Sequence, residues 1–209
     1  MISFSEIETT TKRASKAAGF SWGVAEEIGK SIRSLELFGL PGVINLNHYL
    51  KKIKKKHPKK IKKIERENKI EKKNKTEDKE FCPIYSGVAF LDRCLELEKL
   101  KSLKFYNVSY PLLMLPFISR ASEIMSKKIL VQFDNSSFLL NFDKSIFSKN
   151  IEKQAQSQAK VVNIEFIENK NSFSEQDWKE LYKLSEETFV GESDNLKKTA
   201  AGAGLTDND

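Results

Sequence analysis

Hydrophobic side chains in the first fifty residues recur at the spacing of amphipathic helices and predict three of them. The first helix is expected from Ser3 to Ala18, with Ser3 and Glu6 matching the capping-box pattern. The second is expected between Ser21 and Gly39, since serine favours the start of a helix and glycine its end. The third is expected to begin at Pro41 and to bury Val43, Leu46, Leu50 and Ile53.

From residue 81 onward the pattern alternates between helical and strand periodicity, and short helices and strands are expected in turn. We predict first a helix over 87–100, with Val88, Leu91 and Leu95 on its buried side, and then a strand over 105–110. A buried apolar segment of undecided type over 111–118, a helix over 120–125, a hairpin over 129–142 and a strand over 161–167 are expected to follow. The last predicted element is a helix that begins at Ser174 or Asp177 and continues through Trp178, Leu181 and Leu184. This order predicts an α+β fold.

A lysine-rich insert, residues 51–80, divides the chain. It holds 15 Lys and Arg against 6 Asp and Glu, whereas the rest of the chain has a net charge of −2. Its few apolar residues cannot make a core, so we expect a disordered or loosely helical surface insert. The prediction is one domain overall: a helical part over 1–50, the insert, and a mixed part over 81–209. Within this domain we expect the N-terminal helices to pack with a small, mainly antiparallel sheet and a late helix.

The positive charge raises the question of nucleic-acid binding. The chain as a whole has a net charge of +7, carried by 31 Lys and 5 Arg against 29 acidic residues. Proteins that read nucleic acid rely on arginine for bidentate contacts to phosphates and base edges. A lysine excess of this kind is typical of compositional bias, so nucleic acid is not the expected partner. Binding through residues 51–80 is kept as a third hypothesis.

Cysteine usage and the length of the apolar segments indicate a soluble, cytoplasmic protein. Cys82 and Cys94 lack CxxC spacing, and a chain of 209 residues needs no disulfide. The N-terminus has no basic region followed by an apolar run, as a signal peptide would. The most apolar stretch, residues 110–118, is too short to span a bilayer, so no membrane association is expected.

Few residues have the pattern of a catalytic or metal centre. Cys82 and His48 would form a nucleophile pair if the fold brought them together. The alternative is that Cys82 is a small buried hydrophobe. The Cys and His residues lack zinc spacing, and the acidic C-terminal region has no calcium-loop pattern, so no metal is assigned and the cofactor stays unknown.

The last ten residues, Ala-Ala-Gly-Ala-Gly-Leu-Thr-Asp-Asn-Asp, have the most unusual composition. Alternating alanine and glycine permits positive φ angles, which can turn successive N–H groups toward an anion. The segment is neither a P-loop nor a dinucleotide-binding fingerprint. Leu205 favours docking of this tail, because an apolar side chain near a terminus gains from burial.

Three parts of the chain carry a family resemblance: residues 19–27 with 39–42, residues 82–87 with 91–92 and 111–117, and the closing residues 202–209. Together they resemble a family of bacterial proteins of unknown function that end in Gly-Ala-Gly-Ala-Gly-Leu-Thr-Asp-Asn-Asp. The family pattern has Arg where this chain has Lys197 and Gly where it has Ala200, which weakens an anion-binding role for that region. The resemblance implies that the tail belongs to the domain and that the insert is a variable loop.

The leading functional hypothesis is a small-molecule metabolic protein, an enzyme or an enzyme subunit, with a polar site between the N-terminal helices and the docked tail. Arg33 would hold the carboxylate of a small substrate, and Glu26 or Asp92 would act as acid or base. Cys82 is the third catalytic candidate. The other residues expected to bind substrate are Trp22, Thr206, Asp207 and Asp209.

Each candidate also has a structural interpretation, with Trp22 in the core and Glu26 and Arg33 as a pair on a helix surface. For the whole protein, the second hypothesis is a non-catalytic accessory or assembly protein. Its tail would insert into a partner protein or into a neighbouring subunit of a homo-oligomer.

Overall fold

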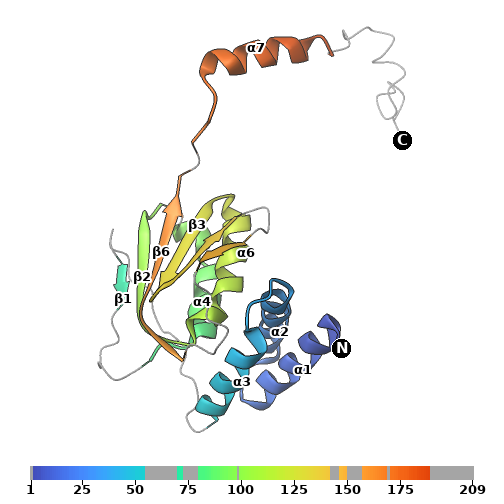
Figure 1. Cartoon of the computed structure of the whole chain (residues 1–209), viewed down its shortest axis with the longest axis vertical. Helices are drawn as coiled ribbons and strands as arrows, with labels where there is room; N and C mark the ends of the chain where they lie inside the picture. The colour runs from blue at the N-terminus through green and yellow to red at the C-terminus, as the bar shows by residue number, and fades with distance from the viewer. Residues whose placement is uncertain are drawn as a thin grey trace, which may run out of the picture. The chain divides into compact units, whose positions relative to one another are not determined.

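The computed structural model describes residues 2–54, 70–72, 80–97, 99–141, 146–149, 157–168 and 170–188. These residues form helices and a mainly antiparallel sheet, so the predicted α+β class is confirmed (Figure 1). The chain divides into two compact units, unit 1 over residues 1–169 and unit 2 over residues 170–209. No helix in the described residues is long and apolar enough to cross a lipid bilayer.

Three helices open unit 1: α1 (Phe4–Ala17), α2 (Trp22–Leu37) and α3 (Gly42–Ile53). Their ends follow the local signals of the sequence. The side chains of Ser3 and Ser21 accept hydrogen bonds from backbone N–H groups in the first turns of α1 and α2. Gly19 and Gly39, with φ angles of 102° and 70°, follow the ends of these helices in the left-handed region that glycine adopts readily.

The buried face of α3 differs from the prediction. Val43 is 39% exposed, whereas Leu46 is buried as expected and Leu50 and Ile53 are partly buried. Buried Tyr49 and Asn45 complete the inner face. The cause is the close approach of α2, because a Cβ atom on Gly42 would lie 2.9 Å from the Cβ of Leu35. Pro41 is the N-cap residue of α3 and precedes its first turn.

The next helices are α4 (Pro83–Leu91), α5 (Cys94–Leu97) and α6 (Leu115–Met125), with a 3-10 turn, η1 (Pro111–Met114), before α6. The single helix predicted over 87–100 is therefore wrong, since it starts earlier and breaks at Asp92 and Arg93. The break rotates the second half, and Leu95 is 62% exposed. The undecided apolar segment 111–118 forms η1 and the buried first turn of α6.

One sheet completes unit 1, with strand order β1-β2-β6-β3-β4-β5. All neighbouring strands are antiparallel except β1, which runs parallel to β2. α6 contacts β3 and β4, and α4 packs against α6 beside the sheet (Figure 1). The strands are β1 (Ile70–Lys72), β2 (Ser102–Ser109), β3 (Lys128–Phe133), β4 (Ser136–Leu140), β5 (Ile146–Lys149) and β6 (Gln158–Ile167).

The predicted hairpin and the strand over 161–167 are confirmed as β3, β4 and β6, and the strand over 105–110 as β2. Two strands were not predicted. β1 lies inside the segment 51–80, where a disordered or loosely helical insert was expected, and β5 follows the hairpin. Both are short and are defined by backbone pairing with a neighbouring strand, which no side-chain pattern reveals. Residues 55–69 and 73–79 lie outside the described residues.

The described part of unit 2 contains one helix, α7 (Glu175–Glu186), as predicted from Ser174 onward. Residues 189–209, including Thr206, Asp207, Asp209 and Leu205, lie outside the described residues. The docking of the tail therefore stays a prediction.

Candidate functional site

Local hydrogen bonds fix the start of α7. The Ser174 hydroxyl oxygen accepts from the backbone N–H of Asp177 at 3.1 Å, and the Asp177 carboxylate accepts from the Ser174 backbone N–H at 2.8 Å. These reciprocal bonds form a capping box, which satisfies two N–H groups that the first turn of a helix leaves free. The hydrogen bonds from Ser174 also lower the pKa of the Asp177 carboxyl group below its usual value. The N-terminus of α7 is therefore well specified by its own residues.

Large apolar side chains of unit 2 are exposed. Every described residue of unit 2 is exposed, and α7 buries none of its side chains. Helical spacing places Trp178, Leu181 and Tyr182 on one face, because residues three and four apart lie side by side. Five residues define this surface, which is called the α7 apolar surface here: Phe173, Trp178, Leu181, Tyr182 and Leu184, with exposed fractions of 47%, 54%, 60%, 51% and 61%.

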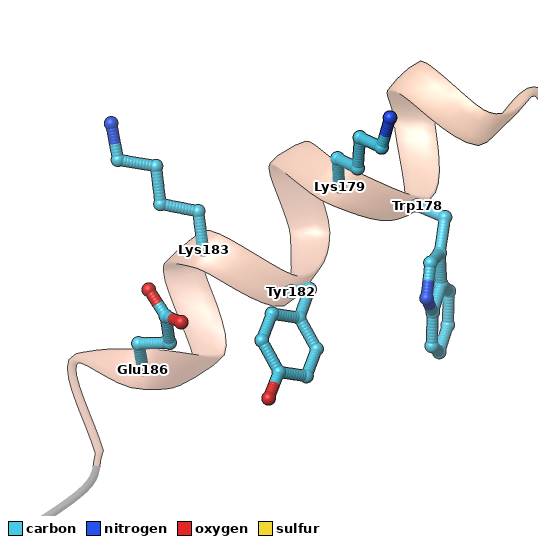
Figure 2. Close-up of a pocket in the computed structure, with 5 residues that line it drawn as sticks. All are labelled: Trp178, Lys179, Tyr182, Lys183 and Glu186. Carbon is cyan, nitrogen blue, oxygen red and sulfur yellow. The ribbon is translucent and has the colours of Figure 1, made fainter.

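The two sides of α7 differ in character. Figure 2 shows Trp178 and Tyr182 extending from one side of the helix, and Lys179 and Lys183 from the other. These four residues and Glu186 line a shallow hollow on the helix surface. The ring of Trp178 also stacks on Phe173, with centroids 5.7 Å apart, so the start of the surface is a pair of aromatic rings.

An exposed helix of this kind is suited to docking. A helix of 12 residues is marginal in water on its own, because its stability depends on packing an amphipathic face. Contiguous exposed apolar patches in soluble proteins often mark interaction sites. The arrangement can bind an apolar surface.

Cys82, one of the predicted catalytic residues, is the N-cap residue of α4 and is partly buried. Its sulfur accepts a hydrogen bond from the Tyr49 hydroxyl at 2.8 Å and one from the backbone N–H of Tyr85 at 3.4 Å. Burial raises the pKa of the Cys82 thiol, and the hydrogen bond from Tyr49 offsets this only in part. Burial likewise raises the pKa of Tyr49, so both groups stay protonated at neutral pH. A protonated thiol is a weak nucleophile.

The nucleophile pair considered from the sequence differs from the contacts in the structure. The Cys82 sulfur bonds to Tyr49, while the neighbouring residue His48 is exposed on α3. Around this pair, Lys52 forms an ion pair with Glu80 and donates to the Ser109 hydroxyl at 3.3 Å. Since Lys52 and Glu80 stand near the two ends of the segment 51–80, their ion pair joins those ends. The cluster connects α3 to the start of α4.

Trp22, Glu26 and Arg33 lie on the same side of α2, and each contacts a residue of α1. The Lys16 ammonium lies 5.4 Å from the Trp22 ring centroid, the Lys12 ammonium 3.6 Å from the Glu26 carboxylate, and the Glu8 carboxylate 3.0 Å from the Arg33 guanidinium. Glu26 also pairs with Lys30 of α2 at 3.4 Å. The hydrogen bond from Lys30 and the charges of both lysines lower the pKa of Glu26, which keeps it ionised at neutral pH.

The structure thus brings three of the candidates together at the seam between α1 and α2, where they join two helices. Trp22 is 59% exposed at this seam, so its placement in the core is not observed. Cys82 and Asp92 stand at opposite ends of α4, and the Asp92 side chain is exposed. The described residues contain no group of three or more His, Cys, Asp or Glu side chains that could hold a metal ion.

Trp178, Leu181 and Leu184 were predicted to lie in a helix and were not selected as functional residues, and Tyr182 was not singled out. A signal was present, because apolar side chains recur at helical spacing between charged ones. That pattern cannot distinguish a helix that packs inside its own domain from one that packs on another protein. Only the exposure of the side chains makes the distinction.

Comparison with known proteins gives a family without an assigned activity. A family model described as "Protein of unknown function (DUF3726)" matches residues 2–77, a range that holds α1, α2, α3 and β1. The expectation of a family of unknown function is therefore confirmed for this part of the chain, and the closing residues 202–209 lie outside the match. No curated protein and no solved structure matches the chain.

Proposed function

We propose that this chain is a non-catalytic accessory or assembly protein that docks onto a partner protein through the α7 apolar surface. One observation carries the proposal: five large apolar side chains of unit 2 are each 47% to 61% exposed, and four of them belong to α7, a helix that buries none of its side chains. Burying such side chains contributes roughly 1.5–3 kcal/mol each. A partner with a complementary apolar surface would therefore supply the packing that α7 lacks in unit 2.

The contacts of the predicted catalytic residues also support a non-catalytic role. Glu26 forms ion pairs that keep it charged, and Arg33 is engaged by Glu8. Cys82 is a helix cap with a raised pKa. Each residue has a structural role that accounts for its position. The small-molecule site between the N-terminal helices and residues 206–209 stays a prediction, because those last residues lie outside the described part of the chain.

We also propose the cellular compartment in which docking takes place. In the described structure Cys82 and Cys94 are thiols and not halves of a disulfide, which suits a reducing cytoplasm. The resemblance set out for residues 19–27, 82–87 and 202–209 supports a bacterial source. We therefore place the docking event in the bacterial cytoplasm, between this chain and another protein.

Site-specific photo-crosslinking tests the proposal. The full chain is made with p-benzoylphenylalanine in place of Leu181, in the cells that naturally produce the protein, and irradiated. We expect a protein adduct, because position 181 lies at the centre of the surface that docks. Lys183 provides the matched control, because Figure 2 shows its side chain on the side of α7 away from Trp178 and Tyr182. The same group at position 183 should give little adduct, and equal yields from both positions would count against docking through this face.

A further inference from the structure

One edge of β2 in unit 1 is covered by a short piece of the lysine-rich segment 51–80. On one side, β2 pairs with β6 from Ser102 to Ser109. On the other side, residues 70–72 of β1 pair in parallel with residues 103–105 (Figure 1). A strand edge without such a neighbour presents a row of unpaired N–H and C=O groups, which is a template for pairing with another chain.

Phe81 extends this cover toward the end of β2. Its backbone N–H donates to the Asn107 carbonyl oxygen at 2.7 Å, and its carbonyl oxygen accepts from the Ser109 N–H at 3.1 Å. Together these bonds form a parallel bridge opposite Val108. β1 and Phe81 therefore occupy two successive stretches of the same edge, residues 103–105 and 107–109.

The two ends of the segment are fixed at one end of β2. Lys52, near the end of α3, forms an ion pair with Glu80 and donates to the Ser109 hydroxyl at 3.3 Å. Ser109 is the last residue of β2. The chain thus leaves α3 and returns to α4 beside the edge that β1 covers, so the cover is tied to the strand it protects.

The composition of the segment suits this position. Natural proteins protect sheet edges with very short strands and with charged side chains, lysine above all. β1 has three residues, and the segment 51–80 holds 15 Lys and Arg against 6 Asp and Glu. Two copies of such a segment repel each other. β2 itself has Leu103, Phe105 and Val108 buried on one face and is rich in residues that favour strands.

We infer that β1 is a cover that keeps the β2 edge from pairing with the β2 edge of a second copy of this chain. The second copy is the partner because every copy has the same edge, and two identical edges pair antiparallel about a twofold axis. Edge-to-edge pairing of this kind is the hazard that an uncovered apolar strand creates. The inference does not depend on the α7 apolar surface, which belongs to unit 2.

The full-length double variant Ile70→Pro with Glu71→Pro tests the inference. Proline has no backbone N–H, and successive backbone groups alternate between the two sides of a strand, so the pair removes a donor that faces β2. The matched control is Ile70→Val with Glu71→Gln, which removes the same charge and keeps both N–H groups. Sedimentation over a range of concentrations should show the mass of the proline variant rising toward twice that of one chain. The control and the unaltered chain should not show this rise.

Hydrogen exchange locates the association. In the associated proline variant the backbone amides of residues 103–105 should stay protected, because the second copy takes the place of β1. Exchange as fast as in an unprotected peptide would place the contact elsewhere and overturn the inference. Equal masses for all three proteins at every concentration would also overturn it. So would loss of the far-UV circular dichroism of the proline variant, because β1 would then be required for folding and could not act only as a cover.

Discussion

Replacing Trp178 and Leu181 together by alanine is expected to weaken binding of the partner more than about 100-fold. Buried aromatic and aliphatic anchors dominate protein interfaces, and truncating one such residue costs about 2 kcal/mol or more. These two residues are 54% and 60% exposed in the described structure, so they are available to a partner. The measurement is a titration of the full-length variant and of the unaltered chain with the purified partner that the photo-adduct identifies.

Loss of the helix cannot explain that result, because alanine has a higher helix propensity than tryptophan or leucine. The matched control is Gln176→Ala with Lys183→Ala, which removes two exposed polar side chains, seven residues apart, from the side of α7 away from Trp178 and Tyr182. This control should bind within about twofold of the unaltered chain, as expected for exposed polar contacts. If both double variants lose affinity equally, the α7 apolar surface is not the interface.

Gly87→Ala is expected to destabilise unit 1 by about 2 kcal/mol. A Cβ atom at position 87 would lie 2.5 Å from the Cδ2 atom and 2.8 Å from the Cγ atom of Phe117, a fully buried ring. Overpacking of this kind costs about 3 kcal/mol, and the better helix propensity of alanine offsets about 1 kcal/mol of it. The midpoint of thermal unfolding should fall by about 5 °C.

Gly23→Ala is the matched control for this packing argument. Gly23 lies in the first turn of α2, and a Cβ atom there would meet no other atom within 4 Å. The substitution should therefore be neutral or stabilise the protein by up to about 1 kcal/mol. Chemical denaturation of both variants gives the two free energies of unfolding. Equal losses of unfolding free energy in the two variants would show that close packing of α4 on α6 does not cause the effect of the substitution at position 87.

The sequence was most informative where structure depends on neighbouring residues. Ser3, Ser21 and Ser174 cap helices as predicted, and Gly19 and Gly39 follow helix ends, because a cap is formed by side chains and backbone within a few residues. The ion pair between Glu26 and Lys30 also follows from their spacing on one helix. In each case the partner is specified by a short sequence separation.

Features that depend on distant residues could not be predicted in the same way. The inner face of α3 is set by Leu35 of α2, so the exposure of Val43 does not follow from the periodicity of α3. Strand β1 forms because its backbone pairs with β2, over thirty residues away along the chain. Similarly, the pairing of Arg33 with Glu8 and the hydrogen bond from Tyr49 to Cys82 depend on helix packing.

For the candidate site, the sequence identified the helix but not its role. Residues 174–184 were predicted to be helical, and α7 confirms this. Their apolar residues were assigned no functional role, since burial against the same chain and burial against another protein require the same periodicity. Exposure of Trp178, Leu181 and Tyr182 in the structure is the observation that separates these two interpretations.

Hydrogen exchange of the backbone amides in residues 179–186 measures the central claim most directly, because it reports whether α7 is covered. In the free, full-length protein these amides should exchange within about tenfold of an unprotected peptide, since a short helix without packing opens readily. In complex with the partner they should exchange far more slowly. Strong protection of these amides in the free protein, unchanged when the partner is added, would contradict the account.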